Sequence, residues 1–297
     1  MTQTLENEFW HLEIIPNLGA SIKKLEAKIG SSLTPVMRVT PDSALNGNSA
    51  SPCSSFTLAP FSNRIRDAKF VFEGRGYQLR ATAPDGTTQH GDVRNQPWQV
   101  IRGNHALECY FDSRNVPNFN FPFPIRMTVI YTMIENTLTT HLELENFGNS
   151  RIPAGFGLHP YFMRNLGSDD VKLEFQAQGI YQTDSSFIPT EAMKPIPAEY
   201  DFSSSRHVAD LPINHVYGGW NGMATLEYQQ ASLKLEASEV FSHLCVFASP
   251  DGTLAVEPIS HCTDGFNLLA QGLQNTGVRI LEPGEVLRGW VRLTIEG

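Results

Sequence analysis

The sharpest chemical signal in this chain is a histidine in a rigid setting, within the segment GFGLHPYF at residues 155–162. Pro160 follows His159 and restricts its backbone, and two aromatic residues come next. An imidazole titrates near neutral pH, so a histidine held in this way can donate or accept a proton in a reaction. His159 is therefore a candidate acid, with a purely structural role as the alternative.

A carboxylate of comparable interest ends the apolar run Thr253–Val256, in the tripeptide Val256-Glu257-Pro258. A carboxylate at the end of a buried strand is unfavourable unless it is paired or takes part in chemistry. Glu257 is therefore a candidate for a role in chemistry, and a structural ion pair is the alternative.

Two further segments place polar residues among glycine and proline, which is typical of a pocket built from loops on a β scaffold. The segment LAPFSNRI at residues 58–65 holds Asn63 and Arg64, which we assign to substrate binding, with a solvated or salt-bridged arginine as the alternative. The segment QHG places His90 beside a glycine, which allows a ligand to approach closely. Two larger side chains follow, either in the core or on a binding surface: Arg94 and Trp98.

Other catalytic and metal-binding signatures are absent or weak. The chain has no G-x-S-x-G nucleophile elbow, no phosphate-binding P-loop and no H-E-x-x-H motif. A zinc site would draw on His243, Cys245, His261 and Cys262. Adjacent His261 and Cys262 would point to opposite faces of a strand, and structural zinc sites use wider spacings, so we expect no metal.

Taken in order, these segments resemble the aldose 1-epimerases, also called galactose mutarotase-like proteins. The resemblance rests on LAPFSNRI, QHG with Arg94 and Trp98, GFGLHPYF, and VEPISHCTDGFN at residues 256–267. It implies a large antiparallel β-supersandwich with an open sugar-binding cleft and no metal or organic cofactor. By motif, it implies Glu257 as the catalytic base, His159 as the catalytic acid, and Arg64 and His90 as sugar-binding residues.

One position departs from the family pattern. The resemblance leads us to expect an acid that binds sugar hydroxyls before an aromatic-containing turn, and the matching segment is Ile213–Tyr217, where Asn214 stands in the place of the acid. An amide offers two donors and removes repulsion toward an acidic sugar, so Asn214 is a candidate for substrate selection. The alternative is that Asn214 only caps a loop.

The elements that must position these residues are predicted to be β-strands. Apolar residues alternate with polar ones in Leu138–Glu145, which predicts a hairpin with Met127–Ile134 around Glu135-Asn136, and Lys69–Leu79 predicts a second hairpin around Gly74–Gly76. No long segment keeps helical periodicity, and 23 Gly and 19 Pro interrupt the chain, so helices should be few and short. We expect an all-β fold, a large antiparallel β-sandwich, with residues 1–297 as a single domain. Asp264-Gly265-Phe266-Asn267 is predicted to be a turn.

Composition limits the partners. With a formal net charge of -9 and no run of Lys and Arg, the chain lacks the basic surface that nucleic-acid binding needs. Its first ten residues do not form a signal peptide and no segment is apolar enough to span a membrane, so we expect a cytoplasmic protein. The expected partner is a small-molecule aldose, and the oligomeric state stays undetermined.

The expected activity is the interconversion of α and β anomers of a hexose by acid–base ring opening and closure, and three alternatives stay open. A hexose-phosphate 1-epimerase would need an anion clamp, for which Arg64, Arg66 and Arg94 are available. A glycosidase would need a second carboxylate, either Asp251 or Asp264. A sugar-binding protein without catalytic activity is the third.

Overall fold

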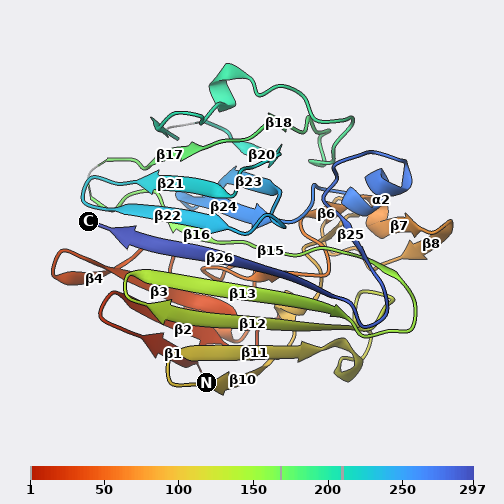
Figure 1. Ribbon diagram of the computed structural model, residues 1–297, viewed down its shortest axis with the longest axis horizontal. Coiled ribbons are helices and arrows are strands. Elements are labelled where there is room, and N and C mark those ends of the chain that lie inside the picture. Colours follow the sequence, from red (N-terminus) through yellow and green to blue (C-terminus); the bar gives the residue numbers. More distant parts are fainter. Residues whose placement is uncertain (1, 168, 209–210) are drawn as a thin grey trace.

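The largest element of the fold is a nine-stranded antiparallel sheet, whose long strands lie side by side in the computed structural model (Figure 1). The structure describes residues 2–167, 169–208 and 211–297. In spatial order the strands are β10 (Gln99–Arg102), β11 (Ala106–Asp112), β12 (Ile125–Ile134), β13 (Thr137–Asn146), β26 (Val286–Glu296), β22 (Ser232–Ala237), β21 (Met223–Glu227), β17 (Lys172–Phe175) and β19 (Arg206–His207).

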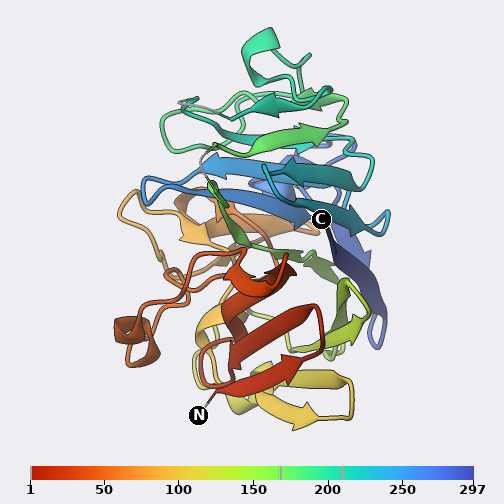
Figure 2. The ribbon, with the colours of Figure 1, turned by 90° about the vertical axis from the view of Figure 1, so that its left-hand side faces the viewer.

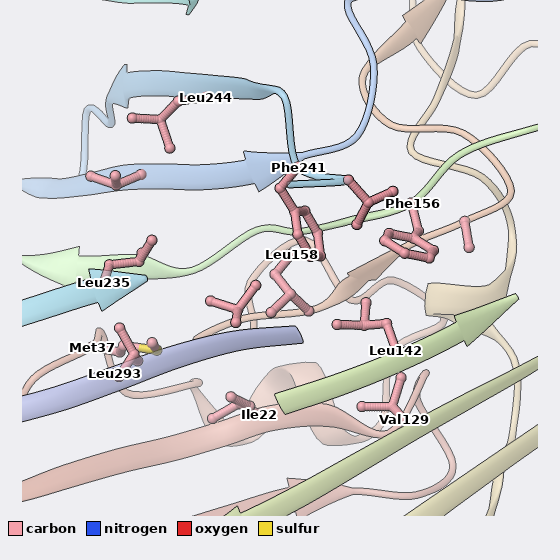
Figure 3. Packing of buried hydrophobic residues seen from close by; sticks show 14 of the residues in the cluster. Ile22, Met37, Val129, Leu142, Phe156, Leu158, Leu235, Phe241, Leu244 and Leu293 are labelled. Carbon is pink, nitrogen blue, oxygen red and sulfur yellow. The ribbon is translucent and has the colours of Figure 1, made fainter. Parts of the chain in front are cut away.

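A seven-stranded antiparallel sheet packs against this sheet. Its strands are β18 (Gly179–Ile180), β20 (Asn214–Gly218), β23 (His243–Ala248), β24 (Thr253–Ile259), β15 (Gly157–Leu158) and β5 (Thr57–Leu58), with β16 (Tyr161–Met163) also paired to β24. Figure 3 shows Leu142 and Leu293 of the first sheet close to Leu158 of the second, within one apolar core. Burial of such side chains supplies the main favourable free energy of folding.

The remaining strands extend the sandwich. A four-stranded sheet near the N-terminus lies beside β11, as the red and yellow strands of Figure 2 show. It consists of β1 (Gln3–Glu6), β2 (Trp10–Ile15), β3 (Ser21–Ile29) and β4 (Ser32–Pro35). Three two-stranded pairs are β6 (Arg64–Ile65) with β9 (Thr88–Gln89), β7 (Lys69–Phe72) with β8 (Arg75–Gln78), and β14 (Ile152–Ala154) with β25 (Arg279–Leu281).

Helices are short. In the described residues the α-helices are α1 (Asp42–Leu45) and α2 (Gly265–Ala270), and single 3-10 turns occur at Arg66–Ala68, Val93–Asn95, Ser113–Asn115 and Ala198–Tyr200. None of the helices in this part of the chain is long and apolar enough to cross a membrane. The prediction of an all-β sandwich with few short helices is confirmed.

Both predicted hairpins are present. Strands β12 and β13 pair from Ile125↔Asn146 to Ile134↔Thr137, with Glu135 in the left-handed region at φ 50°. In the second hairpin the turn lies at Glu73-Gly74, and Arg75 already pairs with Phe72. The turn is one residue earlier than the sequence predicts, because positive φ at both Glu73 and Gly74 closes a two-residue turn.

Candidate active site

The four sequence segments that carry the chemistry are in mutual contact. Gly91 approaches the first segment so closely that a Cβ atom at this position would lie 1.7 Å from the carbonyl oxygen of Ala59. Backbone N–H groups make the other contacts: Gly155 donates to the Pro60 oxygen at 2.8 Å, Asp264 to the Arg64 oxygen at 2.8 Å, and Ser62 to His261 Nε2 at 3.0 Å. The segments therefore form one site, although up to about two hundred residues separate them in the chain.

Strand β24 places Glu257 on the side of the seven-stranded sheet that faces away from the main core. Leu254 and Val256 belong to the core between the sheets, whereas Ala255 and Ile259 belong to a second apolar cluster on the opposite face. Side chains alternate along a strand, so Glu257 shares the face of Ala255 and Ile259. We name this side of the sheet the Glu257 face.

The pairing of β24 with its neighbours brings His159 beside Glu257. Gly157 of β15 pairs with Ile259, and Tyr161 of β16 pairs with Ala255. His159 lies midway between Gly157 and Tyr161, so the same register places it opposite Glu257. The two side chains are in contact, with 3.3 Å between His159 Nε2 and Glu257 Oε1.

Aromatic rings hold the imidazole of His159 in place. The Phe56 and Tyr161 rings lie 4.7 and 4.5 Å from the His159 ring, centroid to centroid. The Tyr161 hydroxyl is 3.4 Å from Nε2 of His159, and the His159 backbone N–H donates to the Phe56 oxygen at 3.0 Å. This packing fixes the ring orientation and excludes water from most of its surface.

Burial changes the protonation of both partners. Glu257 is 2% exposed and His159 is 5% exposed. Desolvation raises the pKa of Glu257 to about 8, against a smaller opposite effect of its hydrogen bond with Cys245 and of the nearby Arg64 charge. Desolvation, with the charges of two arginines, holds the pKa of His159 well below its usual value. At neutral pH the pair therefore holds one proton, and because the two groups are coupled this proton belongs to the pair.

Two atoms of this pair have no hydrogen-bond partner among the residues that the structure describes. They are Oε2 of Glu257 and Nδ1 of His159, both buried. Unpaired buried polar atoms are unfavourable, and they concentrate where a protein binds or transforms a ligand.

Next to this pair, the second predicted segment positions a neutral histidine. His90 adopts φ 64°, and its Nδ1 accepts a hydrogen bond from the Asn63 backbone N–H at 3.2 Å. Burial, with nearby positive charges, lowers the pKa of His90 well below its usual value, so the ring is neutral and Nε2 carries its proton. The His90 and His159 rings are 5.2 Å apart, centroid to centroid, so His90 can donate to a ligand bound at the His159–Glu257 pair.

Arg64 is held by several partners at the edge of the site. Gln89, with its amide oxygen toward the guanidinium, accepts from Nε at 3.1 Å and from Nη2 at 3.2 Å. Asp85 lies 3.8 Å from Nε, and the guanidinium carbon is 5.0 Å from the Phe187 ring centroid. Nη1 donates to the Asn63 side-chain oxygen at 3.4 Å, so Asn63 acts here on Arg64 through its side chain and on His90 through its backbone.

The whole chain can be compared with known proteins. Residues 1–294 match the family described as aldose 1-epimerase. The chain belongs to the aldose 1-epimerase family. The resemblance inferred from the four segments is thus confirmed at the level of the family.

Individual known proteins are similar to this one along most of the chain. The uncharacterized protein YphB of Escherichia coli K12 is 26% identical over 274 residues, which cover 89% of each chain. The crystal structure of a putative aldose 1-epimerase from the same organism has a TM-score of 0.85 at 25% identity, covering 100% of this chain and 99% of the other. The galactose 1-epimerase from Lactobacillus acidophilus NCFM shares the fold, with a TM-score of 0.77 at 18% identity over 99% and 93% of the two chains.

The epimerase fold places Asn214 on the Glu257 face but at some distance from the pair. Asn214 begins β20 and pairs with Phe247 of β23, which in turn pairs with Ala255 of β24. The residue of β20 in line with Glu257 is Val216, because Val216 pairs with Cys245 and Cys245 pairs with Glu257. Asn214 therefore lies two strands away from Glu257 and two residues along. It is a strand residue and not a loop cap, and a role in substrate selection stays a prediction.

Several contributors to the site were not predicted from the sequence. They are Phe56 and Tyr161, which flank His159, Cys245, which contacts Glu257, and Gln89, which holds Arg64. Tyr161 and Gln89 lie within the recognised segments. Cys245 has a weaker signal, its place in an apolar strand that pairs with the strand of the base.

One other interpretation changes, and one open alternative is decided. Asp264-Gly265-Phe266-Asn267 is not a simple turn, because Asp264 adopts φ 56° and Gly265 begins helix α2. The Asp264 carboxylate accepts from the Arg66 backbone N–H at 3.1 Å, and this contact stabilises the start of the helix beside β6. Trp98 belongs to the core, where its Nε1–H donates to the Val93 oxygen at 2.9 Å.

The residues of the zinc alternative have protein partners. His243 Nε2 is 3.2 Å from the Tyr181 hydroxyl, and His261 Nδ1 is 2.7 Å from the Cys262 oxygen. Within the described ranges, no three His, Cys, Asp or Glu side chains are grouped so that they could hold a metal ion. All four cysteines are buried thiols.

Proposed function

We propose that this chain is an aldose 1-epimerase that interconverts the α and β anomers of an aldose. The observation that carries the proposal is the buried pair in which His159 Nε2 and Glu257 Oε1 are 3.3 Å apart and share one proton at neutral pH. Anomer interconversion needs one group to take a proton and a second group to give one at the same small site. Family membership supports this assignment.

In the proposed reaction, Glu257 as a carboxylate takes the proton of the C1 hydroxyl. His159 as an imidazolium gives its proton to the ring oxygen, which also takes the electron pair of the breaking bond to C1. C1 becomes the aldehyde, the former C1 hydroxyl proton lies on Glu257, and His159 is neutral. This is the distribution that burial favours. Rotation about the C1–C2 bond presents the other face of the aldehyde, and the reverse transfers close the ring with no net change in the protein.

Donors at the edge of the site would position the sugar. His90 offers its Nε2–H and Arg64 offers its guanidinium, and both can bind hydroxyl groups or the ring oxygen. Holding C1 between the pair in this way lowers the entropic part of the barrier. The proposed reaction moves only protons within one small molecule, so it requires neither a metal nor an organic cofactor.

The other candidate activities have less support. The second carboxylates considered for a glycosidase have other partners, since Asp251 forms an ion pair with Arg38 at 3.0 Å and Asp264 accepts from Arg66. A sugar-binding protein without catalytic activity would not need an acid next to a base, and both would be buried at a free-energy cost.

The direct test is anomer exchange measured by NMR or polarimetry over a panel of free and phosphorylated aldoses. We expect the rate of equilibration of at least one sugar to rise in proportion to protein concentration, and chelator treatment to leave that rate unchanged. Spontaneous rates for the whole panel would contradict the proposal.

A further inference from the structure

Two arginines pack on the aromatic rings that flank His159. The Arg38 guanidinium carbon lies 3.4 Å from the Tyr161 ring centroid, and that of Arg94 lies 5.1 Å from the Phe56 ring centroid. Both side chains also bind Ser51, because Arg38 donates to its backbone oxygen and Arg94 Nη1 donates to its Oγ at 3.2 Å. Two guanidinium groups therefore meet at one serine. Each of them packs on an aromatic ring that also packs on His159, the proposed acid.

The two arginines differ in how their charges are balanced. Arg38 has a carboxylate partner, Asp251 at 3.0 Å, and a second acceptor in the Cys53 backbone oxygen at 2.9 Å. Arg94 is 7% exposed and forms no ion pair within 4 Å in the described part of the chain. Its hydrogen bond to Ser51 is the one its side chain makes to the described residues, and its Nε is buried without a partner. The charge of the Asp92 carboxylate acts on Arg94 without a direct contact, and Asp92 itself lies 3.7 Å from Arg80. A buried guanidinium without a direct counter-ion is unfavourable, so its retention indicates a ligand that supplies further negative charge.

This arrangement stands out in an acidic protein. The chain has a formal net charge of -9, yet Arg38, Arg64 and Arg94 surround the His159–Glu257 pair. Although burial lowers the pKa of Arg94 to about 10, the side chain stays protonated at neutral pH. Guanidinium groups bind phosphate, sulfonate and carboxylate oxygens by charge-assisted hydrogen bonds.

We propose that Arg94, with Arg38 and Ser51, forms a subsite for an anionic substituent of the sugar, so that the preferred substrate is an acidic aldose. This inference rests on the proposed epimerase function and specifies its substrate class. In this arrangement C1 lies at Glu257 and His159, and the anionic group of the same sugar lies next to Arg94, whose charge acts on both His159 and His90.

The wild-type protein gives the first test. Anomer exchange is measured for D-glucose, D-glucose 6-phosphate and D-glucuronate, at one ionic strength. We expect kcat/KM to be about 10- to 100-fold higher for at least one of the two acidic sugars, the range expected for a hydrogen bond to a charged group. The more active of these two sugars distinguishes a phosphate from a carboxylate substituent. Equal or higher efficiency with D-glucose would overturn the subsite.

The second test removes the unbalanced charge. Arg94→Gln keeps a donor for Ser51 and removes the charge, and we expect the ratio of kcat/KM for the acidic sugars to that for D-glucose to fall by about 10-fold or more. Arg94→Lys should restore part of the preference. The matched control is Arg288→Gln, which removes an exposed guanidinium that pairs with Glu143 at 3.0 Å on the nine-stranded sheet. An equal loss with neutral and acidic sugars would show that Arg94 acts only through packing, and would overturn the proposal.

The failure of the epimerase function can be distinguished from the failure of the subsite. If no sugar equilibrates faster than in buffer, the function is wrong, and calorimetric binding of D-glucose 6-phosphate and D-glucuronate against D-glucose to the wild-type protein then tests the subsite separately. Tighter binding of an acidic sugar supports the subsite, and no preference overturns it. The binding measurement also decides the case if Arg94→Gln does not fold.

Discussion

The two faces of the seven-stranded sheet are equally buried and differ in what burial does. On the core face, Leu244 and Val256 are fully buried against apolar neighbours, and their burial stabilises the fold. On the Glu257 face, Glu257 and His159 are buried almost as completely, and each keeps one polar atom without a partner. One strand, β24, supplies both faces. The comparison teaches that burial of apolar side chains stabilises the sheet, whereas burial of Glu257 and His159 costs stability and, under the proposed function, prepares the pair for proton transfer.

The largest expected effect comes from Glu257→Gln, which removes the charge and keeps the shape. Turnover should fall by about 10²- to 10⁴-fold, the usual effect of losing a general base. Stability should rise. The pKa of Glu257 is raised from 4.5 to about 8 in the folded state, so between these values the folded protein binds more protons than the unfolded chain and loses stability as the pH increases. The stability gain of the variant should therefore grow from pH 5 to pH 8, as measured by urea unfolding.

If Glu257→Gln were as active as the wild type, Glu257 would not be the base. If the gain in the free energy of unfolding of the variant over the wild type were smaller at pH 8 than at pH 5, the distinction between the two faces would be wrong.

The converse change is Leu244→Ala on the core face. The cavity should destabilise the protein by about 2–5 kcal/mol, whereas kcat of the folded fraction should stay within about 3-fold of the wild type. Leu244→Met, of nearly the same volume, is the matched control and should lose less than about 1.5 kcal/mol. Urea unfolding and anomer exchange on the same samples separate the two effects. A loss of kcat greater than the loss of folded protein would show that the faces are coupled.

A smaller effect is expected for Cys245→Ala, which sharpens the description of the Glu257 face. The hydrogen bond with Cys245 lowers the pKa of Glu257, so its removal should raise that pKa further. The pair loses its shared proton above a pH of about 8, so kcat/KM of the wild type should fall at alkaline pH. In Cys245→Ala this alkaline fall in kcat/KM should occur at a higher pH. Cys245→Ser keeps a donor and should retain the wild-type profile. An unmoved limb in Cys245→Ala would remove Cys245 from the positioning of the base.

The smallest effect is expected for Asn214→Asp, which adds a negative charge to the Glu257 face at a distance from the pair. Repulsion through a partly hydrated site should reduce the efficiency with acidic sugars relative to D-glucose by roughly 2-fold. The ratio of the two kcat/KM values is the measurement, and the same ratio at high salt is the control, because screening should weaken the effect. Identical ratios for the variant and the wild type at low salt would remove Asn214 from substrate selection.

The sequence predicted the elements that depend on local patterns. The β12–β13 hairpin follows from alternation and a two-residue turn. His159 stands out because a proline follows it, and Glu257 because it ends an apolar run. The sequence could not predict features that depend on long-range pairing. The ring contact of Phe56 with His159 requires β5 to pair with β15, about one hundred residues away. Asp264 was assigned to a turn because Asp, Gly and Asn are common both in turns and at the start of helices. The long-range contact of Asp264 with the Arg66 backbone, which accompanies the helix start, cannot be seen in the sequence.

The pairing of β15 and β16 with β24 restricts which insertions the chain can accept. Gly157 and Tyr161 keep one register with Ile259 and Ala255 although the strand is interrupted at His159-Pro160. One residue added between Gly157 and Tyr161 would turn the imidazole to the opposite face or shift it along β24, because side chains alternate along a strand. The Glu135-Asn136 turn, remote from these strands, can lengthen without this effect. Length variation among active homologues should therefore be concentrated in such turns, and the length of the five-residue segment from Gly157 to Tyr161 should be kept.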